Sequence, residues 1–292
     1  MPCEHDGIYL AVASTSAIYL LCLQAQGDEA IKTIIDANPG VTEPGNLKFI
    51  QLDLLDLESV KAAAATFAKQ EAKLDVLWNN AGMGACRVAA DERTVQGFEP
   101  MVGMHCIATL LFTTLLLPQL QAAGAARVLW LASQLIDEDA PLNGVDFDKL
   151  DSGFVPYVKD TNSALIKNYT MSKAGTWFTG REFARRHEKD GIMSVILNPG
   201  NLKTNTWEGS PALVTRFFHT FVTYDAIYGA YTELYAGLSP ELTMEKHNGV
   251  YVIPWGRIHP DEKFVSHEAC GRGRAYAKKL DEWYERQWKL YV

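Results

Sequence analysis

The feature that most constrains the fold of this 292-residue chain is a series of short apolar runs separated by segments of helical pattern. Ile18 to Leu23 carries no charged residue, as expected for a strand buried on both faces. A stripe at i, i+3, i+4 and i+7, typical of a helix packed on a sheet, is formed by Val60, Ala63, Ala64 and Phe67. Further strands are predicted at 48–52, 74–78, 127–132, 193–197 and 250–253, and further helices at 28–37, 104–117, 211–237 and 275–290. This alternation predicts an α/β fold, a Rossmann-like doubly wound parallel sheet covered on both faces.

The organisation of the chain gives no sign of a second domain. It contains no internal repeat and no flexible linker, so residues 1–292 are predicted to form a single domain. The last predicted helix places one apolar stripe on its surface, formed by Leu280, Trp283, Tyr284 and Trp288. We expect this stripe to pack on its own domain; a homodimer contact or a substrate lid is the alternative.

Composition excludes several classes of protein. Hydrophobic residues make up 48% of the chain and charged residues 21%, which is typical of a globular protein with a large core. The net charge of −8, from 35 acidic and 27 basic residues, argues against a nucleic-acid partner. No zinc-ligand spacing occurs, and no metal is expected. The five cysteines are scattered and odd in number, which indicates reduced thiols in a cytoplasmic protein.

One uncharged segment, residues 7–26, requires a separate decision. A membrane helix needs about 20 mainly apolar residues, but Ser14, Thr15 and Ser16 stand at the centre of this segment. A signal peptide needs a basic start, but Glu4 and Asp6 precede it. We therefore expect buried strand here rather than a membrane or signal segment.

Tyr169 and Lys173 form the first candidate catalytic pair. Residues four apart on a helix share a face, and an ammonium group close to a tyrosine lowers its pKa. Lowering the pKa of a tyrosine from about 10 to about 7 would allow it to exchange a proton with a substrate oxygen at neutral pH. The alternative is an ordinary surface pair on a helix.

Three other stretches accompany this pair in a characteristic order. Asn79-Asn80-Ala81-Gly82 follows one predicted strand, Ser133 follows another, and Asn198-Pro199-Gly200 follows a third. With Tyr169 and Lys173, they resemble the short-chain dehydrogenase/reductase family from about Ala17 to the C-terminus. The stretches 115–120 and 253–257 resemble its retinol-dehydrogenase-like fungal branch, many members of which are reductases of secondary metabolism.

The resemblance implies catalytic roles for three residues. Ser133 would orient the substrate oxygen and Tyr169 would exchange the proton. Lys173 would lower the pKa of Tyr169 and hold the cofactor ribose. The implied reaction is hydride transfer between a nicotinamide cofactor and an alcohol or ketone.

The resemblance also assigns cofactor contacts. Asp53 would accept a hydrogen bond from the adenine, and Asn80 would lie beside the cofactor. The backbone of Leu202 and the hydroxyl of Thr204 would contact the carboxamide. The alternatives are a loop or helix-capping role for Asp53 and a strand-tying role for Asn80. The resemblance to this branch favours NADP, and NAD stays open. The stretch Cys22-Leu23-Gln24 contains neither the arginine that would hold the 2′-phosphate of NADP nor the acidic residue that would bind the ribose of NAD.

The substrate region implied by the resemblance comes from about 135–165 and 205–270. Its aromatic residues favour a bulky apolar alcohol or ketone, although they could equally belong to the core; they are Phe154, Tyr157, Trp207, Phe217 and Phe218.

The chain departs from the family pattern in two places. Members begin with a strand, a glycine-rich phosphate loop and a helix, whereas residues 1–16 contain no such loop. His105 stands where the family has an asparagine that anchors a water in a proton relay. A histidine could serve there, or it could be a packed helix residue. Three hypotheses are compatible with the sequence: an NADP-dependent oxidoreductase, a non-catalytic remnant that binds cofactor weakly, and a reductase anchored by residues 7–26.

Overall fold

An eight-stranded sheet forms the centre of the protein in the computed structural model, which describes residues 9–13, 17–22, 24–41, 46–85, 88–89, 92–141, 144–151, 161–203, 216, 222–260 and 272–292. The strand order is β3-β2-β1-β4-β5-β6-β7-β8. The strands are β1 (Tyr9–Ala13), β2 (Ala17–Cys22), β3 (Asn46–Gln51), β4 (Val76–Asn79), β5 (Arg127–Leu131), β6 (Met193–Leu197), β7 (Tyr251–Ile253) and β8 (Arg257–Ile258). The order reverses between β1 and β4, which is the switch point at which doubly wound sheets bind ligands.

Strands β2 to β7 run in one direction, which confirms the predicted parallel sheet. The prediction is incomplete at the two ends of the strand series. β8 pairs antiparallel with β7, and β1 pairs antiparallel with both of its neighbours, β2 and β4. β1 is antiparallel to β2 because the connection between the two strands is short. Residues 14–16 are too few for the crossover of about a dozen residues that a parallel pair requires.

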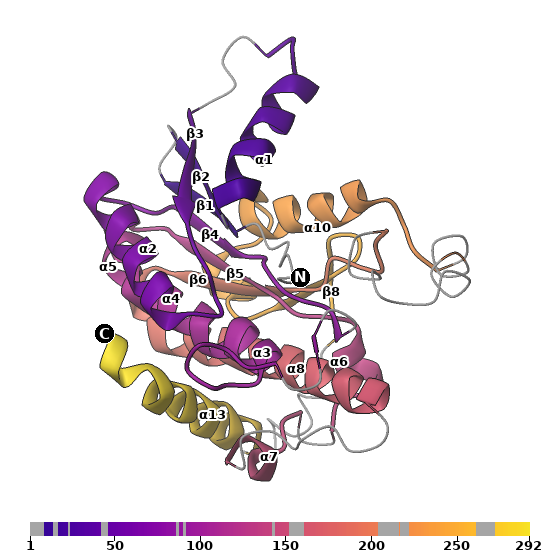
Figure 1. Ribbon diagram of the computed structural model, residues 1–292. Coiled ribbons are helices and arrows are strands. Elements are labelled where there is room, and N and C mark those ends of the chain that lie inside the picture. Colours follow the sequence, from indigo (N-terminus) through magenta and orange to yellow (C-terminus); the bar gives the residue numbers. More distant parts are fainter. Residues whose placement is uncertain are drawn as a thin grey trace.

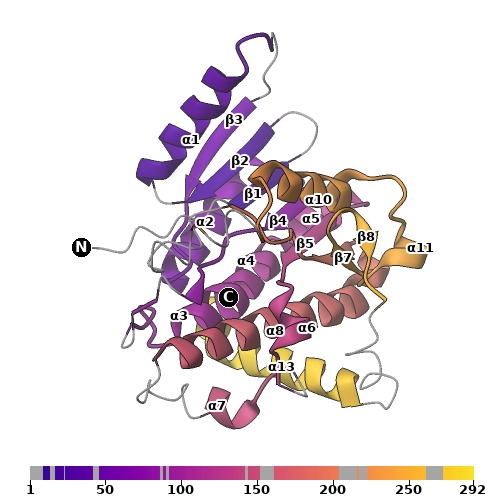
Figure 2. The same cartoon turned by 90° about the vertical axis from the view of Figure 1, so that its right-hand side faces the viewer.

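Helices cover both faces of the sheet (Figure 1). One face carries α2 (Leu57–Gln70), α4 (Thr109–Leu115) and α8 (Thr161–His187), whose apolar side chains form the larger core with the sheet. The other face carries α1 (Gln24–Ala37) and α10 (Ala226–Leu238). Figure 2 shows α1 beside β2 and β3 at one end of the molecule. The shorter helices are α3 (Pro100–Val102), η3 (Gly103–Ala108), α5 (Leu117–Ala123), α6 (Leu135–Glu138), α7 (Phe147–Asp151), η4 (Glu188–Asp190), α11 (Met244–His247) and η6 (Lys289–Tyr291).

The helix predicted at 104–117 differs in an informative way. It begins earlier, at Pro100, and its middle turn, Gly103–Ala108, is a π-helix, a feature often found at functional sites. Pro118 lies in the first turn of α5, where a missing backbone N–H costs little.

The C-terminal helix α13 (Arg272–Trp288) packs on its own domain, as expected. Leu280, Trp283, Tyr284 and Trp288 are buried. Arg186 of α8 forms ion pairs with Asp281 and Glu285 of α13, and Figure 1 shows the two helices side by side.

The uncharged segment 7–26 contains β1, β2 and the first residues of α1, so the expectation of strand is confirmed for its described part. Among the described helices, none is by itself long and apolar enough to span a membrane. One bent pair, Pro100–Leu115 with Leu117–Ala123, meets the length and composition criteria together.

Candidate active site

The carboxyl edge of the parallel strands gathers the candidate residues from distant parts of the chain. Asn80, Ser133 and Asn198 directly follow, or lie two residues beyond, the ends of β4, β5 and β6. Ser133 is fixed at two points: its carbonyl accepts a hydrogen bond from the hydroxyl of Tyr251 at 3.1 Å, and its Oγ accepts one from the N–H of Leu135 at 3.3 Å. The serine therefore has a defined position at the sheet edge.

Tyr169 and Lys173 reach the same point from α8. Gly180 brings this helix close to the sheet, because a Cβ there would lie 2.5 Å from a side-chain carbon of Ile196. The phenol of Tyr169 lies close enough to the hydroxyl of Ser133 for the serine to lower its pKa. Lys173 is only 4% exposed, and its Nζ donates to the carbonyl of Leu131 at 2.8 Å. The structure thus brings Ser133, Tyr169 and Lys173 together.

The electrostatics of this trio differ from the expectation. Burial raises the pKa of Tyr169 above its ordinary value, and the hydrogen bond with Ser133 only partly offsets this effect. Burial also lowers the pKa of Lys173 to about 8. The expected lowering of the Tyr169 pKa by Lys173 is therefore not found in this structure. The lysine Nζ lies 5.9 Å from the centre of the tyrosine ring and is bonded to a carbonyl instead.

A buried histidine completes the cluster. Nε2 of His105 accepts a hydrogen bond from the N–H of Met83 at 3.0 Å, and Nδ1 lies 2.8 Å from Oγ of Ser172. Oγ of Ser172 in turn donates to the carbonyl of Tyr169 at 2.7 Å. His105 stood out in the sequence by its departure from the family pattern, whereas Met83 and Ser172 carried no signal that the sequence could reveal.

Two glycines at this edge lie directly against neighbouring side chains. A Cβ on Gly82 would lie 2.9 Å from Nε2 of His105 and 3.1 Å from Nζ of Lys173, so no larger residue fits. Gly200 has a φ of +96°, which favours glycine, and its N–H is bonded to Oδ1 of Asn198 at 2.9 Å. These positions suit the nicotinamide and ribose half of a dinucleotide, with Tyr169 and Lys173 facing the same edge.

The predicted cofactor contacts Asp53 and Asn80 differ in their surroundings. Oδ1 of Asp53 accepts from the N–H of Leu55 at 2.8 Å, which is the loop role named as the alternative. Asn80 is half-buried at the edge, but the tie to a neighbouring element is made by Asn79, which donates to Oγ1 of Thr113 at 3.0 Å.

Leu202 pairs with Tyr224 in a short β-bridge and contacts Gly229 of α10, where a Cβ would lie 2.2 Å from the leucine Cδ1. Thr204 lies outside the described residues, as do the five aromatic residues proposed for the substrate region.

The described part of the chain contains no helix N-terminus at the switch point that could hold the pyrophosphate half of a dinucleotide. In a doubly wound sheet, the strand at the switch point delivers the chain to the carboxyl edge, where a helix N-terminus holds phosphates. β1 occupies that place but runs the other way, so its carboxyl end and the connection to β2 lie at the opposite edge. The residues that fit a cofactor are therefore confined to β4 and the elements after it.

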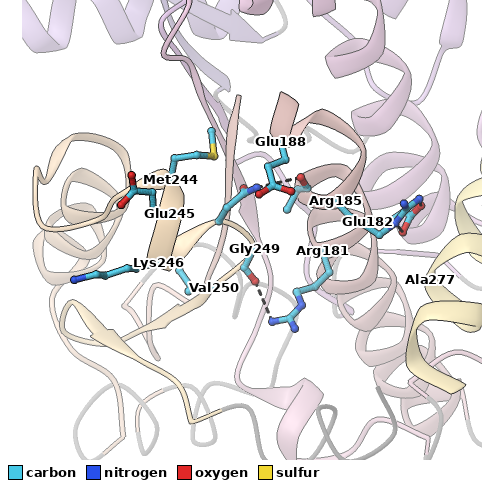
Figure 3. A pocket seen from close by; sticks show the side chains of 12 residues that line it. Arg181, Glu182, Arg185, Glu188, Met244, Glu245, Lys246, Gly249, Val250 and Ala277 are labelled. Carbon is cyan, nitrogen blue, oxygen red and sulfur yellow. Dashed lines mark hydrogen bonds and ion pairs between the residues drawn. The ribbon is translucent and has the colours of Figure 1, made fainter. Parts of the chain in front are cut away.

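Two hollows border these elements. A cleft of about 400 Å³ opens between the loops that follow β5, β6 and β7, and its lining residues include Gln134, Asn198, Tyr224, Trp255 and His259. A second hollow of about 410 Å³ lies where β6 and β7 begin, with Arg181 bonded to the carbonyl of Gly249 at 3.1 Å (Figure 3). Because strand beginnings and ends lie at opposite edges of a parallel sheet, the first hollow is at the same edge as Ser133 and the second at the opposite edge.

Comparison with known proteins agrees with this geometry. The short chain dehydrogenase family matches residues 10–144. The short-chain dehydrogenase/reductase iacJ of Pestalotiopsis fici is 42% identical over 269 residues, covering 90% of this chain and 79% of that protein. A short-chain dehydrogenase/reductase of Phomopsis amygdali is 37% identical over 281 residues, covering 92% and 80%.

Solved structures show the same fold. An uncharacterized protein from Mycobacterium paratuberculosis superposes with a TM-score of 0.60 at 23% identity, covering 95% of this chain and 94% of that one. The NADPH-bound carbonyl reductase from chicken fatty liver superposes with a TM-score of 0.55 at 21% identity, covering 82% and 86%. Sequence relatives, fold and the arrangement at the carboxyl edge lead to one conclusion. The chain belongs to the short-chain dehydrogenase/reductase family.

Proposed function

We propose that this protein is an NAD(P)-dependent oxidoreductase that interconverts an alcohol and a ketone. The observation that carries the proposal is the convergence of Ser133, Tyr169 and Lys173 at one point of the carboxyl edge, with the hydroxyl of Ser133 near enough to Tyr169 to lower its pKa. A phenol beside a serine hydroxyl can hold a substrate oxygen and exchange a proton with it.

The electrostatics favour ketone reduction as the direction. A raised pKa keeps Tyr169 protonated at neutral pH. The protonated phenol is the form that donates a proton to the carbonyl oxygen when hydride adds to the carbonyl carbon. Ser133 orients that oxygen. Lys173, with a pKa of about 8, is mainly cationic at neutral pH and stabilises negative charge that develops close by. The nicotinamide supplies the hydride, and Gly82, Gly200 and Leu202 would border it.

Finer features of the proposal rest on the family resemblance. We favour NADP over NAD, a bulky apolar ketone as substrate and a role in secondary metabolism. A reduced cytoplasmic compartment is supported by Cys22 and Cys106, which are buried free thiols. The described part of the cleft combines the aromatic rings of Tyr224 and Trp255 with amide groups, so the substrate would carry hydrogen-bonding groups beside its apolar body.

The direct test is turnover of NADPH and NADH with a panel of aryl ketones, compared between the wild-type chain and Tyr169→Phe. We expect ketone-dependent cofactor oxidation that the substitution abolishes. Ketone-dependent oxidation that survives Tyr169→Phe unchanged would show that another group transfers the proton.

A second candidate function has its own observation. The antiparallel direction of β1 leaves the described residues without a phosphate-binding helix at the switch point. This favours a non-catalytic member of the family that keeps the fold but binds cofactor weakly. Calorimetric titration with NADPH separates the two candidates, because the enzyme requires saturation at cellular cofactor concentrations and the remnant does not.

A further inference from the structure

His105 lies at the contact of three elements that bear on the catalytic trio. It belongs to the π-helical turn η3, is 3% exposed, and is enclosed by α8 and the loop after β4. Its ring meets the ring of Tyr169 edge-on, with 6.0 Å between the centres. A side chain in this position contacts all three elements, so a shift of one element would alter the positions of the other two.

The hydrogen bonds around the ring define its protonation state. A backbone N–H can only donate, so Nε2, which receives the N–H of Met83, must be unprotonated. The hydroxyl of Ser172 donates to the carbonyl of Tyr169, so its oxygen is free to accept from Nδ1 of His105. The network therefore assigns a neutral ring with its proton on Nδ1.

We propose that His105 is a positioning residue: a permanently neutral imidazole that links the backbone of Met83 through Ser172 to the carbonyl of Tyr169 and transfers no proton during the reaction. The catalytic consequence rests on the proposed oxidoreductase function. The bridge fixes the distance between the loop after β4, where Gly82 faces the cofactor edge, and the helical turn that presents Tyr169. Both must keep their relative positions for proton and hydride transfer to occur at one substrate carbonyl.

The charged and titratable surroundings agree with this assignment. Burial lowers the pKa of His105 well below its ordinary value, and the cation of Lys173 lowers it further. The neighbouring titratable groups are Tyr169 and Lys173 on α8, Cys106 beside it, Glu99 before the turn and Tyr284 on α13. Protonation would place a second cation near Lys173 and would break the bond to Met83.

A relay role requires the opposite behaviour. A histidine that passes protons must change its protonation during turnover, so Nε2 would have to release the N–H of Met83 in each cycle. A buried backbone N–H without a partner is costly. Gly82 lies directly against the ring, since a Cβ there would lie 2.9 Å from Nε2 of His105.

The first experiment needs no activity. Nitrogen NMR of the histidine side chains of the full chain, with His105 assigned by the signal lost in His105→Gln, reports the tautomer directly. We expect a neutral ring protonated on Nδ1 that does not titrate between about pH 6 and 8, the range in which an ordinary histidine changes charge. A ring protonated on Nε2, or one that titrates in this range, would overturn the proposal. Because no substrate is used, this result stands even if the protein has no reductase activity.

The second experiment uses two substitutions and a control. His105→Phe keeps the ring and removes both hydrogen bonds, and we expect a kcat about 10- to 100-fold lower, since a buried donor is left unpaired. His105→Gln has an amide that can accept from Met83 and donate to Ser172, and we expect it to recover most of the lost turnover with the wild-type pH profile of kcat. Thr176→Val is the control, because this hydroxyl bonds the carbonyls of His105 and Ser172 at 3.2 Å without joining the imidazole network.

The two roles predict different results for His105→Gln. Glutamine cannot exchange a proton near neutral pH, so a proton carrier would leave it as impaired as His105→Phe, with the acidic limb of the pH profile changed. That outcome, in a His105→Gln protein with wild-type thermal stability, would refute the positioning role. The same experiment with an inactive wild-type chain would count against the proposed function, and the NMR result would then decide the state of His105 alone.

Discussion

The two halves of the sheet are built from similar sequences but differ in the groups that they present at the carboxyl edge. β4, β5 and β6 are short buried strands that run in parallel, and they are followed within two residues by Asn80, Ser133 and Asn198. β2 and β3 are equally regular and also parallel, but the strand that joins the two halves, β1, runs against both neighbours. The half from β4 onward gathers the candidate residues Ser133, Tyr169 and Lys173, whereas the described part of the other half holds no phosphate-binding loop.

This comparison shows that the hydrogen bonding of a strand within a sheet and its contribution to a ligand-binding site are separate requirements. An antiparallel strand satisfies the backbone hydrogen bonds of β2 and β4 as well as a parallel one does. The direction of the strand matters only for the segment that comes after it, because the chain must leave at the edge where the ligand binds. The fold can thus persist where the cofactor site is incomplete.

The largest expected effect tests the intact half. Tyr169→Phe removes the phenolic proton that the trio offers to a substrate oxygen, and general acid catalysis contributes roughly 10²- to 10⁴-fold. We expect kcat to fall by that factor with an unchanged circular dichroism spectrum. Tyr291→Phe on the C-terminal turn is the matched control and should keep wild-type turnover.

The next effect tests the other half. The described residues include no glycine-rich loop that offers backbone donors to the pyrophosphate. Each charge-assisted hydrogen bond contributes about 1.5–3 kcal/mol, so the loss of two would weaken binding by roughly 10²- to 10⁴-fold. We expect calorimetry to give a Kd for NADPH higher by that factor than for a version that begins with a parallel strand, a glycine-rich loop and a helix. Equal, micromolar binding by both versions would remove the contrast between the two halves.

A third test addresses the strand that joins them. Ala11 pairs with Tyr19 on one side and Leu77 on the other, so a proline at this position loses a hydrogen bond in a central strand. We expect Ala11→Pro to lower the free energy of unfolding in urea by about 3 kcal/mol, while Ala11→Val has little effect. If both variants unfold like the wild type, residues 9–13 do not occupy the centre of the sheet.

The last test concerns Glu233 of α10, whose backbone carbonyl accepts a hydrogen bond from the indole N–H of Trp78 on β4. Burial raises the pKa of its carboxyl from 4.5 to about 7. The folded protein therefore binds a proton that the unfolded chain releases between these values, and stability falls as pH rises from 4.5 to 7. The full loss is on the order of 3 kcal/mol. Glu233→Gln should abolish this dependence in thermal melts between pH 4 and 8, and an unchanged dependence would place its origin elsewhere.

Much of the architecture could be predicted from local pattern. The apolar runs located β2 to β7 within about two residues, because strands buried on both faces leave a continuous hydrophobic signal. The four-residue spacing of Tyr169 and Lys173 predicted a shared helix face for the same kind of reason: helical geometry is local. The assignment of Ser133 to the end of a strand likewise followed from where the run of Val128 to Ala132 stops.

Other properties depended on contacts between distant segments. The direction of β1 was not predicted from the sequence, and it follows from the antiparallel pairing of β1 with β2 and β4. The raised pKa of Tyr169 depends on burial beneath other elements, and the Lys173 ammonium is directed to the carbonyl of Leu131, 42 positions away. The tautomer of His105 is set by Met83 and Ser172, which approach it from the loop after β4 and from α8.

The sequence by itself therefore predicted β2 to β7, the main helices and the candidate reactive groups, because these depend on spacing within one segment. The tertiary structure alone decided which way the switch-point strand runs, how strongly each titratable group holds its proton, and which partner each polar atom meets. The physical reason is that burial, hydrogen bonding and electrostatic interaction act across space, between residues that the chain brings together only when it folds.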